Sequence, residues 1–276
     1  MQRDNALLEV KTAPPGEGPN VFVRIAFAAV LLFLYLPLAY VVLQAFLANP
    51  NDWREGLTLK WIALFLSNPS LWTPLFTSLQ IAMVSAVLAV ALGTLGAVGL
   101  TPLDGRLPSW LQALIVLPIL LPEIVTGLSL LLFFLLARVE LGFWTVATAH
   151  ASFSASFVYF IMVEQLRKLD PQLGEGAQDL GAEPSVIFWK VTLPNIVPGL
   201  IGAWLLAFTL SFDDFLISFF TSGAGVTTLP IKIYSLMKIG VTPELNALSL
   251  VLILVSTGLV VVLMSRENSR QWVLKS

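Results

Sequence analysis

Long uncharged stretches of apolar residues alternate with short polar segments along this chain. Six of these stretches approach or exceed the roughly 20 residues that a helix needs to cross the hydrocarbon of a bilayer. A backbone exposed to lipid has no water with which to form hydrogen bonds, so each stretch is expected to be helical. The predicted spans are Ile25–Phe46, Ser78–Leu100, Trp110–Leu136, Phe143–Val163, Val197–Phe220 and Ala247–Met264.

The composition also indicates a membrane protein. Of the 276 residues, 57% are hydrophobic and 12% are charged, whereas soluble domains average roughly 45–50% apolar and about 25% charged residues. One globular core cannot hold so many apolar side chains, so the bilayer is the expected second apolar solvent. The predicted fold class is therefore an all-α membrane protein, with six transmembrane helices in residues 21–276 and a polar cytoplasmic tail at residues 1–20.

Charge and rare residue types narrow the possible functions. The chain has no cysteine, so disulfides and cysteine metal sites are excluded. Its net charge of −2 argues against a nucleic-acid partner. No group of histidine and carboxylate residues has the spacing of metal ligands, so no metal and no cofactor are expected in the chain itself. His150, the one histidine, is expected to be a packed polar residue rather than a ligand.

Lysine and arginine indicate the orientation, because they gather on the cytoplasmic side of a membrane. One side of the predicted spans holds ten such residues and the other holds five. The ten are Arg3, Lys11, Arg24, Arg106, Arg167, Lys168, Lys190, Arg266, Arg270 and Lys275, and the five are Arg54, Lys60, Arg138, Lys232 and Lys238. Both termini are therefore predicted to be cytoplasmic, and residues 164–196 form the longest cytoplasmic connection. The outer loop Leu47–Thr77 contains Trp53, Trp61 and Trp72, and it is predicted to hold a short interfacial segment or to pack on its own helices.

The cytoplasmic connection contains two helix-start signals. Asp170 is a favoured N-cap before Pro171, and Pro184 can begin a second short helix in the same way. Gly181 stands where the first helix should end, in the left-handed cap position. Positions spaced i, i+4 and i+7 form one apolar face of the first helix, and they are Leu173, Ala177 and Leu180. Such a pair of helices either docks on a partner or tucks its leucines against the helix bundle.

The spacing in this connection resembles the loop signature of ABC importer permeases. That signature reads E-A-A, three residues, G, nine residues and then I-x-L-P, and the matching positions are Glu175, Ala177, Gly181, Leu193 and Pro194. The chain departs from it at Gly176, which replaces the first alanine, and at Val191, which replaces isoleucine. Gly176 weakens a helix by about 1 kcal/mol relative to alanine. The resemblance implies a type I permease fold and a loop that inserts into a groove on a separate ATP-hydrolysing subunit.

The same resemblance implies that a partner supplies the energy. The chain has no Gly-Lys pair, and therefore no phosphate-cradling G-x-x-x-x-G-K-[ST] loop. ATP and Mg are accordingly expected to be used by a partner ATPase that is present as a homodimer. The chain is expected to be a transport subunit and not an enzyme.

Three acidic residues fall within predicted spans. Glu123 lies in the third span, and Asp213 and Asp214 lie in the fifth. A carboxylate in mid-membrane costs roughly 2.5–3.5 kcal/mol on insertion scales, so such residues usually face a partner or a wet cavity. A helical rise of about 1.5 Å per residue places Glu123 roughly 20 Å and Asp213 roughly 24 Å from the cytoplasmic ends of their spans. These residues are predicted to line the outer half of a path for a cation, or else to form structural hydrogen bonds.

The neighbours of these acids refine the prediction. Adjacent helix positions point about 100° apart, so Asp213 and Asp214 should not face one narrow path together, and one of them should bond to a neighbouring helix or a backbone donor. One helical stripe could attract amines through cation–π contact or simply pack against neighbours and lipid, and its members are Phe212, Phe215 and Phe219. Pro118 and Pro122 suit a bent pore-lining helix or a packing kink.

Longer stretches resemble the spermidine/putrescine permease family. They read T-G-L-S-L-L at 126–131, L-A-F-T-L-S-F-D-D at 206–214, and T-T-L-P at 227–230 followed by G-V-T-P-E-L-N-A-L at 240–248. The resemblance implies a polyamine as the solute and the bacterial inner membrane as the location. It also implies a second, different permease chain, an ATPase pair and an outer substrate-binding protein. Related permeases handle iron, thiamine, sulfate or phosphate, so another small solute stays open, although anions fit an acid-lined entrance poorly.

Other functional classes account for fewer of these features. A secondary transporter would often show inverted repeats, and it would leave residues 164–196 unexplained. An intramembrane enzyme would need a nucleophile–base or metal pair at membrane depth, which the adjacent Asp213 and Asp214 do not make. A purely structural scaffold would not need acidic groups within its spans.

Overall fold

The computed structural model describes residues 20–49, 52–100, 107–240, 243, 245–255 and 257–258. The chain divides into two compact units, Met1–Ser67 with Val241–Ser276 and Asn68–Gly240, which are described separately. Nearly all of the predicted tail at residues 1–20, and the C-terminal part of the predicted span Ala247–Met264, lie outside the described residues.

The first unit combines an apolar helix with a small hairpin. Its elements are α1 (Val21–Phe46), β1 (Leu47–Asn49), β2 (Asp52–Leu57), α2 (Lys60–Ser67) and a helix at Leu245–Val255. The two strands pair antiparallel, a feature that the prediction of an all-α fold did not include. Trp61, in the loop for which a short interfacial segment was predicted, belongs to the helix α2. The indole nitrogen of Trp61 donates a hydrogen bond to the Leu47 carbonyl at 2.8 Å, which holds α2 against the hairpin.

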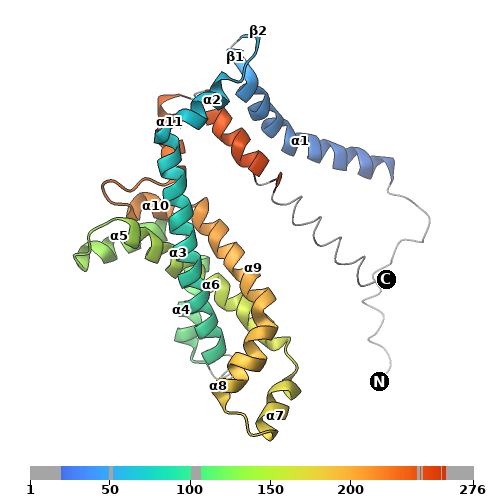
Figure 1. The fold of residues 1–276 in the computed structure, drawn as a ribbon, viewed down its shortest axis with the longest axis vertical. Coiled ribbons are helices and arrows are strands. Elements are labelled where there is room, and N and C mark those ends of the chain that lie inside the picture. Colours follow the sequence, from blue (N-terminus) through green and yellow to red (C-terminus); the bar gives the residue numbers. More distant parts are fainter. Residues whose placement is uncertain are drawn as a thin grey trace. The chain divides into compact units, whose positions relative to one another are not determined.

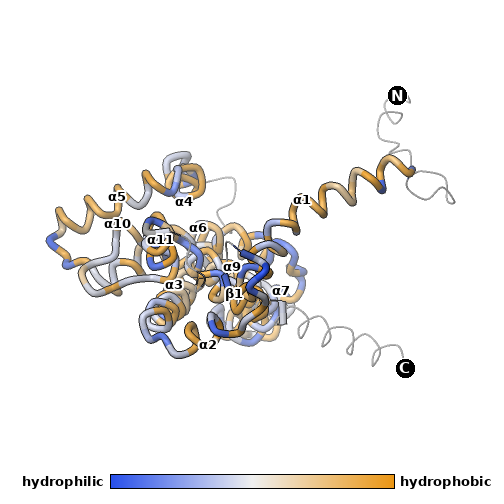
Figure 2. The backbone as a smooth tube through the Cα atoms, turned by 90° about the horizontal axis from the view of Figure 1, so that it is seen from above, coloured by the Kyte–Doolittle hydropathy of each residue, from blue (hydrophilic) through white to orange (hydrophobic). Residues whose placement is uncertain are grey.

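Helix α1 buries almost nothing against the other described elements of its unit. It is apolar over most of its length (Figure 2), yet none of its most apolar 18-residue window is buried. A helix that is hydrophobic all round and exposed needs an apolar surrounding. Lipid and neighbouring membrane chains are the surroundings that suit it.

The second unit is a helical bundle with several short helices at its ends. Its elements are α3 (Pro69–Leu100), α4 (Ser109–Leu120), α5 (Glu123–Leu136), α6 (Phe143–Arg167), α7 (Pro171–Asp179), α8 (Pro184–Ile187), the π-helical turn η2 (Phe188–Thr192), α9 (Leu193–Phe212), α10 (Leu216–Thr221) and α11 (Leu229–Ile239). Helices α3, α6 and α9 lie side by side and form its core (Figure 1). Small side chains fill much of this interface, which lets the backbones approach closely. The buried core residues include Ala86, Ala89, Ala97, Val158, Met162, Ile196, Ala203 and Ala207.

Among the described residues, four helical segments are long and apolar enough to span a membrane. They are Val21–Phe46, Pro69–Leu100, Phe143–Arg167 and Pro184–Phe212, and α4 with α5 makes a fifth if the bent pair counts as one span. A helical membrane fold is therefore confirmed. The number of six spans stays a prediction, because the last predicted span is only partly described.

The third predicted span is bent at Pro122, as predicted, but it consists of two helices and not one. α4 and α5 are separated at Leu121 and Pro122 by a bend of 112°. A proline disfavours helical geometry in the residue before it, and Leu121 accordingly has extended backbone angles of φ −74° and ψ 138°. Pro122 then precedes the first turn of α5. The depth of Glu123 in the membrane was estimated for a straight helix. That estimate was therefore wrong, because the rise per residue does not continue across the bend.

The fifth predicted span also contains a break. α9 ends at Phe212 and not at Phe220, and α10 starts at Leu216. Asp213 and Asp214 consequently lie between two helices. The assumption that both occupy one continuous helix was wrong, because the Asp214 carboxylate accepts hydrogen bonds from backbone amides of α10 in place of a continuing helix.

An alanine at Gly93 is expected to destabilise the contact between α3 and α6. A Cβ atom there would lie 2.6 Å from Val158 Cγ1 and 2.8 Å from the Ala155 carbonyl oxygen. Backbone atoms cannot move aside cheaply, so the free energy of unfolding should fall by about 1–3 kcal/mol. Thermal unfolding in detergent measures the change. Gly96→Ala is the matched control on the same helix, because its Cβ would lie 3.4 Å from the nearest Tyr159 atom, and equal midpoints for both variants would contradict the prediction.

Candidate functional site

The predicted cytoplasmic connection folds into two short helices at the lower end of the second unit in Figure 1. We call residues 170–187 the hook. The Asp170 carboxylate accepts a hydrogen bond from the Gln172 amide at 3.0 Å and so caps α7. Pro184 opens α8 at the first helical position. Both predicted helix starts are confirmed.

The corner of the hook depends on Gly181. This residue has a φ of +79°, in the left-handed region that favours glycine. Its amide donates to the Gln178 carbonyl at 2.8 Å, and the Ala182 amide donates to the Ala177 carbonyl at 3.0 Å. This pair of bonds is the usual glycine cap of a helix end. The predicted left-handed cap is confirmed.

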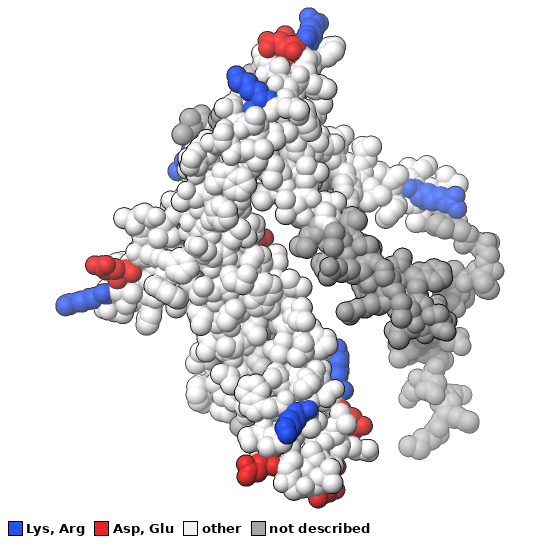
Figure 3. Space-filling model, in the orientation of Figure 1, with Lys and Arg blue, Asp and Glu red and all other residues white. Residues whose placement is uncertain are grey.

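The apolar face of α7 points away from the bundle. Leu180 is 89% exposed and Leu173 is 48% exposed, so the interpretation in which the leucines tuck against the bundle is wrong. Glu175 is also exposed. Figure 3 shows charged side chains gathered at this end of the second unit, while the surface of the bundle above it carries few. The hook therefore presents apolar and charged groups together, a combination suited to contact with another protein.

The hook continues into a membrane helix without an intervening loop. α8 passes into the π-helical turn η2 and then into α9, which begins at Leu193 and Pro194. A proline inside a helical run removes one backbone donor, and a wide π turn directly before it accommodates that loss. The second helix of the hook and α9 therefore form one continuous helical segment, Pro184–Phe212.

Replacing Gly176 by alanine is expected to stabilise α7. No atom lies within 4 Å of a Cβ built at this position, and alanine is better than glycine in a helix by about 1 kcal/mol. Hydrogen–deuterium exchange of the α7 amides should therefore slow by roughly fivefold. Gly181→Ala is the control, and its α7 amides should exchange faster, because alanine is strained at positive φ. Unchanged exchange in Gly176→Ala would contradict the prediction.

The two aspartates between α9 and α10 have different surroundings. The Asp214 carboxylate accepts hydrogen bonds from the amides of Ile217 at 3.3 Å and Ser218 at 2.7 Å, and its side chain is 7% exposed. The prediction that one aspartate bonds to a backbone donor is confirmed, and that residue is Asp214. Asp213 is exposed, and no other side chain among the described residues bonds to it.

Glu123 lies near this pair. It is exposed at the first position of α5, a helix that packs against α10 directly after the two aspartates. The contact between α5 and α10 brings these acids together. Gly127 makes that contact possible, since a Cβ there would lie 3.2 Å from the Leu216 carbonyl oxygen. Glu123 and the adjacent pair Asp213 and Asp214, which are far from it in sequence, therefore gather where two predicted spans break.

The helix break divides the predicted aromatic stripe. Phe212 stacks on Phe208 of α9 with ring centroids 6.0 Å apart. Phe215 instead contacts Phe219 at 5.5 Å and Tyr234 of α11 at 4.7 Å. The prediction of one stripe on one helix was wrong, because α9 ends at Phe212. Both rings are already engaged in aromatic packing within the chain.

A model of the family described as "binding-protein-dependent transport system inner membrane component" matches residues 89–266. The chain belongs to this family. It is a membrane permease subunit of an ABC importer, as the loop signature predicted. The matched range includes the hook and the three acidic residues.

Individual relatives of this permease cover most of its length. The spermidine/putrescine transport system permease protein PotC of Escherichia coli (strain K12) is 35% identical over 246 residues, which are 88% of this chain and 93% of the relative. The putrescine transport system permease protein PotI of the same strain is 39% identical over 237 residues, with 83% and 84% covered. PotC of Haemophilus influenzae is 36% identical over 256 residues, with 90% and 98% covered. The predicted resemblance to spermidine/putrescine permeases is confirmed.

Solved structures support the same fold for the permease. A chain of the MetNI methionine ABC transporter, in an inward facing conformation, superposes with a TM-score of 0.59 at 21% identity and covers 71% of this chain and 93% of its own. A chain of an amino acid ABC transporter superposes with a TM-score of 0.52 at 18% identity, with 76% and 100% covered. At these identities the likeness concerns the fold alone.

His150 of the permease is a buried polar residue, as predicted. Its ring lies 2.6 Å from the Ser211 hydroxyl, 3.1 Å from the Asp214 carboxylate and 3.2 Å from the Ser218 hydroxyl. Sequence reasoning missed both serines. The available signal was a pair of hydroxyl residues flanking two aspartates inside an apolar run. Among the described residues, no three His, Asp or Glu side chains lie in an arrangement that could hold a metal ion.

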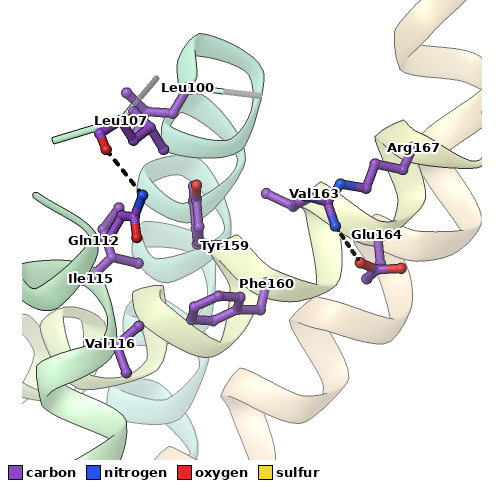
Figure 4. A pocket seen from close by; sticks show the side chains of 10 residues that line it. All are labelled: Leu100, Leu107, Gln112, Ile115, Val116, Tyr159, Phe160, Val163, Glu164 and Arg167. Atoms are coloured by element: carbon purple, nitrogen blue, oxygen red, sulfur yellow. Dashed lines mark hydrogen bonds and ion pairs between the residues drawn. The ribbon is translucent and has the colours of Figure 1, made fainter. Parts of the chain in front are cut away.

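A cavity of about 250 Å³ in the permease lies apart from the acidic group. Figure 4 shows its walls between α4 and α6 and the end of α3. Gln112 donates to the Leu107 carbonyl at 3.0 Å, and Arg167 donates to Glu164 at 3.2 Å. Its polar groups thus bond within the chain. Neither Glu123 nor Asp213 lines this cavity, which therefore does not belong to the predicted acidic path.

Proposed function

We propose that this permease imports a polyamine, spermidine or putrescine, as one of two different permease chains. The exposed carboxylates of Asp213 and Glu123, close together beside a break between membrane helices, carry this proposal. An acidic group in an apolar surrounding is costly unless it meets a partner or a wet path, and it usually marks a route for ions or polar solutes. A polyamine carries the opposite charge. The names of the relatives PotC and PotI support the same class of solute.

We further propose that the hook docks in a groove on a homodimeric ATP-binding subunit, which uses ATP and Mg. Glu175, Gly176, Ala177 and Gly181 would form the docking helix and its corner, and Leu193 and Pro194 would link the hook to α9. The exposed leucines of α7 and the direct continuation into α9 support this role. An outer substrate-binding protein would deliver the solute, and both termini would be cytoplasmic. The chain itself would contribute no catalytic group.

Reconstitution of the permease with its partner subunits in lipid vesicles tests the solute. ATP hydrolysis should rise when spermidine or putrescine is supplied with the binding protein outside. Thiamine, ferric iron, sulfate and phosphate are the comparison solutes. Stimulation by one of these, with no response to either polyamine, would overturn the polyamine assignment. ATP-independent uphill transport would overturn the coupling role.

A further inference from the structure

We infer that His150 is a positioning residue for the solute path, which holds Asp214 away from the path and leaves Asp213 facing it. The inference rests on the proposed function, in which Asp213 meets the cationic solute. His150 itself is 1% exposed and cannot meet the solute. It acts through the backbone between α9 and α10.

One imidazole ring contacts both sides of the helix break. His150 belongs to the core helix α6. Its Nδ1 lies 2.6 Å from Ser211 Oγ, in the last turn of α9. Its Nε2 lies 3.1 Å from Asp214 Oδ2, within the break, and 3.2 Å from Ser218 Oγ, in the first turn of α10. We call these four residues the His150 cluster. A single side chain of the core thus holds the end of one helix, the break and the start of the next.

The partners determine which ring nitrogen carries a proton. An ionised carboxylate only accepts hydrogen bonds, so Nε2 of His150 donates to Asp214. In the neutral imidazole, Nδ1 is then an acceptor, and the Ser211 hydroxyl donates to it. The ring therefore satisfies both nitrogens with groups from one break. Because the cluster is buried, losing one partner would leave another polar group without a hydrogen bond, which disfavours any rearrangement.

This bonding assigns different tasks to two adjacent carboxylates. Asp214 is bonded to His150 and to the amides of Ile217 and Ser218, so it cannot turn toward a solute without breaking those bonds. Asp213 directly precedes it in the same break and is exposed. Holding Asp214 fixes the backbone on one side of Asp213. The position of the Asp213 carboxylate therefore depends on His150, although the two residues share no contact.

The test compares His150→Phe with His150→Gln in the reconstituted complex. Phenylalanine keeps an aromatic ring and removes the contacts with Ser211, Asp214 and Ser218. The amide of glutamine can still donate to Asp214. The half-maximal solute concentration for stimulated ATP hydrolysis should rise about tenfold in His150→Phe, while the rate at saturation stays within about twofold. His150→Gln should recover most of the loss. A fall in the saturating rate without a change in half-maximal concentration would overturn the inference.

A double-mutant comparison shows whether His150 acts through Asp213. In a protein that already carries Asp213→Asn, His150→Phe should not raise the half-maximal solute concentration further, because the residue that His150 positions is already neutral. If the two substitutions raise the half-maximal solute concentration additively, the inference is overturned, while the proposed function is unaffected. If Asp213→Asn alone leaves the half-maximal solute concentration unchanged, Asp213 does not meet the solute and the proposed path is wrong.

A milder variant serves if His150→Phe does not assemble. Ser211→Ala removes only one contact of the cluster and should raise the half-maximal solute concentration as well. An unchanged concentration in Ser211→Ala would overturn the inference.

Discussion

Gly181→Val is expected to reduce ATP-driven uptake at least about tenfold while the membrane helices stay folded. Gly181 has a φ of +79°, and a β-branched residue held there is strained by about 1–3 kcal/mol. The glycine cap of α7 would open, and α7 would lose its angle to α8. No atom lies within 4 Å of a Cβ atom built at Gly181. The effect should therefore come from the backbone conformation and not from a steric clash.

The measurement is uptake into vesicles together with recovery of the ATP-binding subunit on the purified permease. Uptake should fall at least about tenfold, since a distorted hook no longer fits its groove. Gly181→Asn is the matched control, because asparagine tolerates the left-handed conformation, and it should keep most of the uptake. Normal coupling in Gly181→Val would count against the docking role of the hook. A bulky residue at the exposed Glu175 should uncouple hydrolysis in the same way.

Asp213→Asn should weaken the apparent affinity for a polyamine by about tenfold, or roughly 1.4 kcal/mol. The exposed carboxylate would lose its charge and keep its shape. Asp213→Glu keeps the charge and should retain part of the affinity. Uptake at a series of solute concentrations, corrected for the amount of assembled complex, measures the change. Full activity in Asp213→Asn would show that Asp213 has no role in the path.

Asp214→Asn should behave differently and therefore serves as the comparison. Its carboxylate accepts hydrogen bonds from His150 and from two backbone amides. An amide side chain has one acceptor oxygen and cannot replace all of these bonds. The free energy of unfolding of the purified permease, followed by thermal unfolding, should fall by about 1–3 kcal/mol. Equal stability of the Asp213 and Asp214 variants would contradict the division of tasks between them.

Local signals predicted the hook well. The N-cap at Asp170, the proline starts and the glycine corner depend on backbone conformation within a few residues, and each is visible in the sequence. The spacing of the permease signature led to the family for the same reason. The exposure of Leu180 was not predictable, because an apolar helix face looks the same whether it packs inward or awaits a partner.

The bend within the third span was predicted at Pro122, whereas the break within the fifth span was missed because a continuous apolar stretch conceals it. Leu121 and Pro122 signalled a bend, but the angle of 112° depends on how α5 packs against α10. The break at Asp213 has no proline or glycine to announce it. It depends on amides, hydroxyls and an imidazole that lie in three different elements.

The sequence alone determined that this chain spans a membrane, that it belongs with the importer permeases and where its hook begins and turns. Those properties follow from hydrophobicity and from short-range backbone preferences, which each segment carries by itself. Only the tertiary structure decided which aspartate is exposed and which is bonded, and that Glu123 lies near them. The physical reason is that the His150 cluster joins residues 61 and 68 positions apart in the chain, and such contacts form only when the helices that carry them pack together.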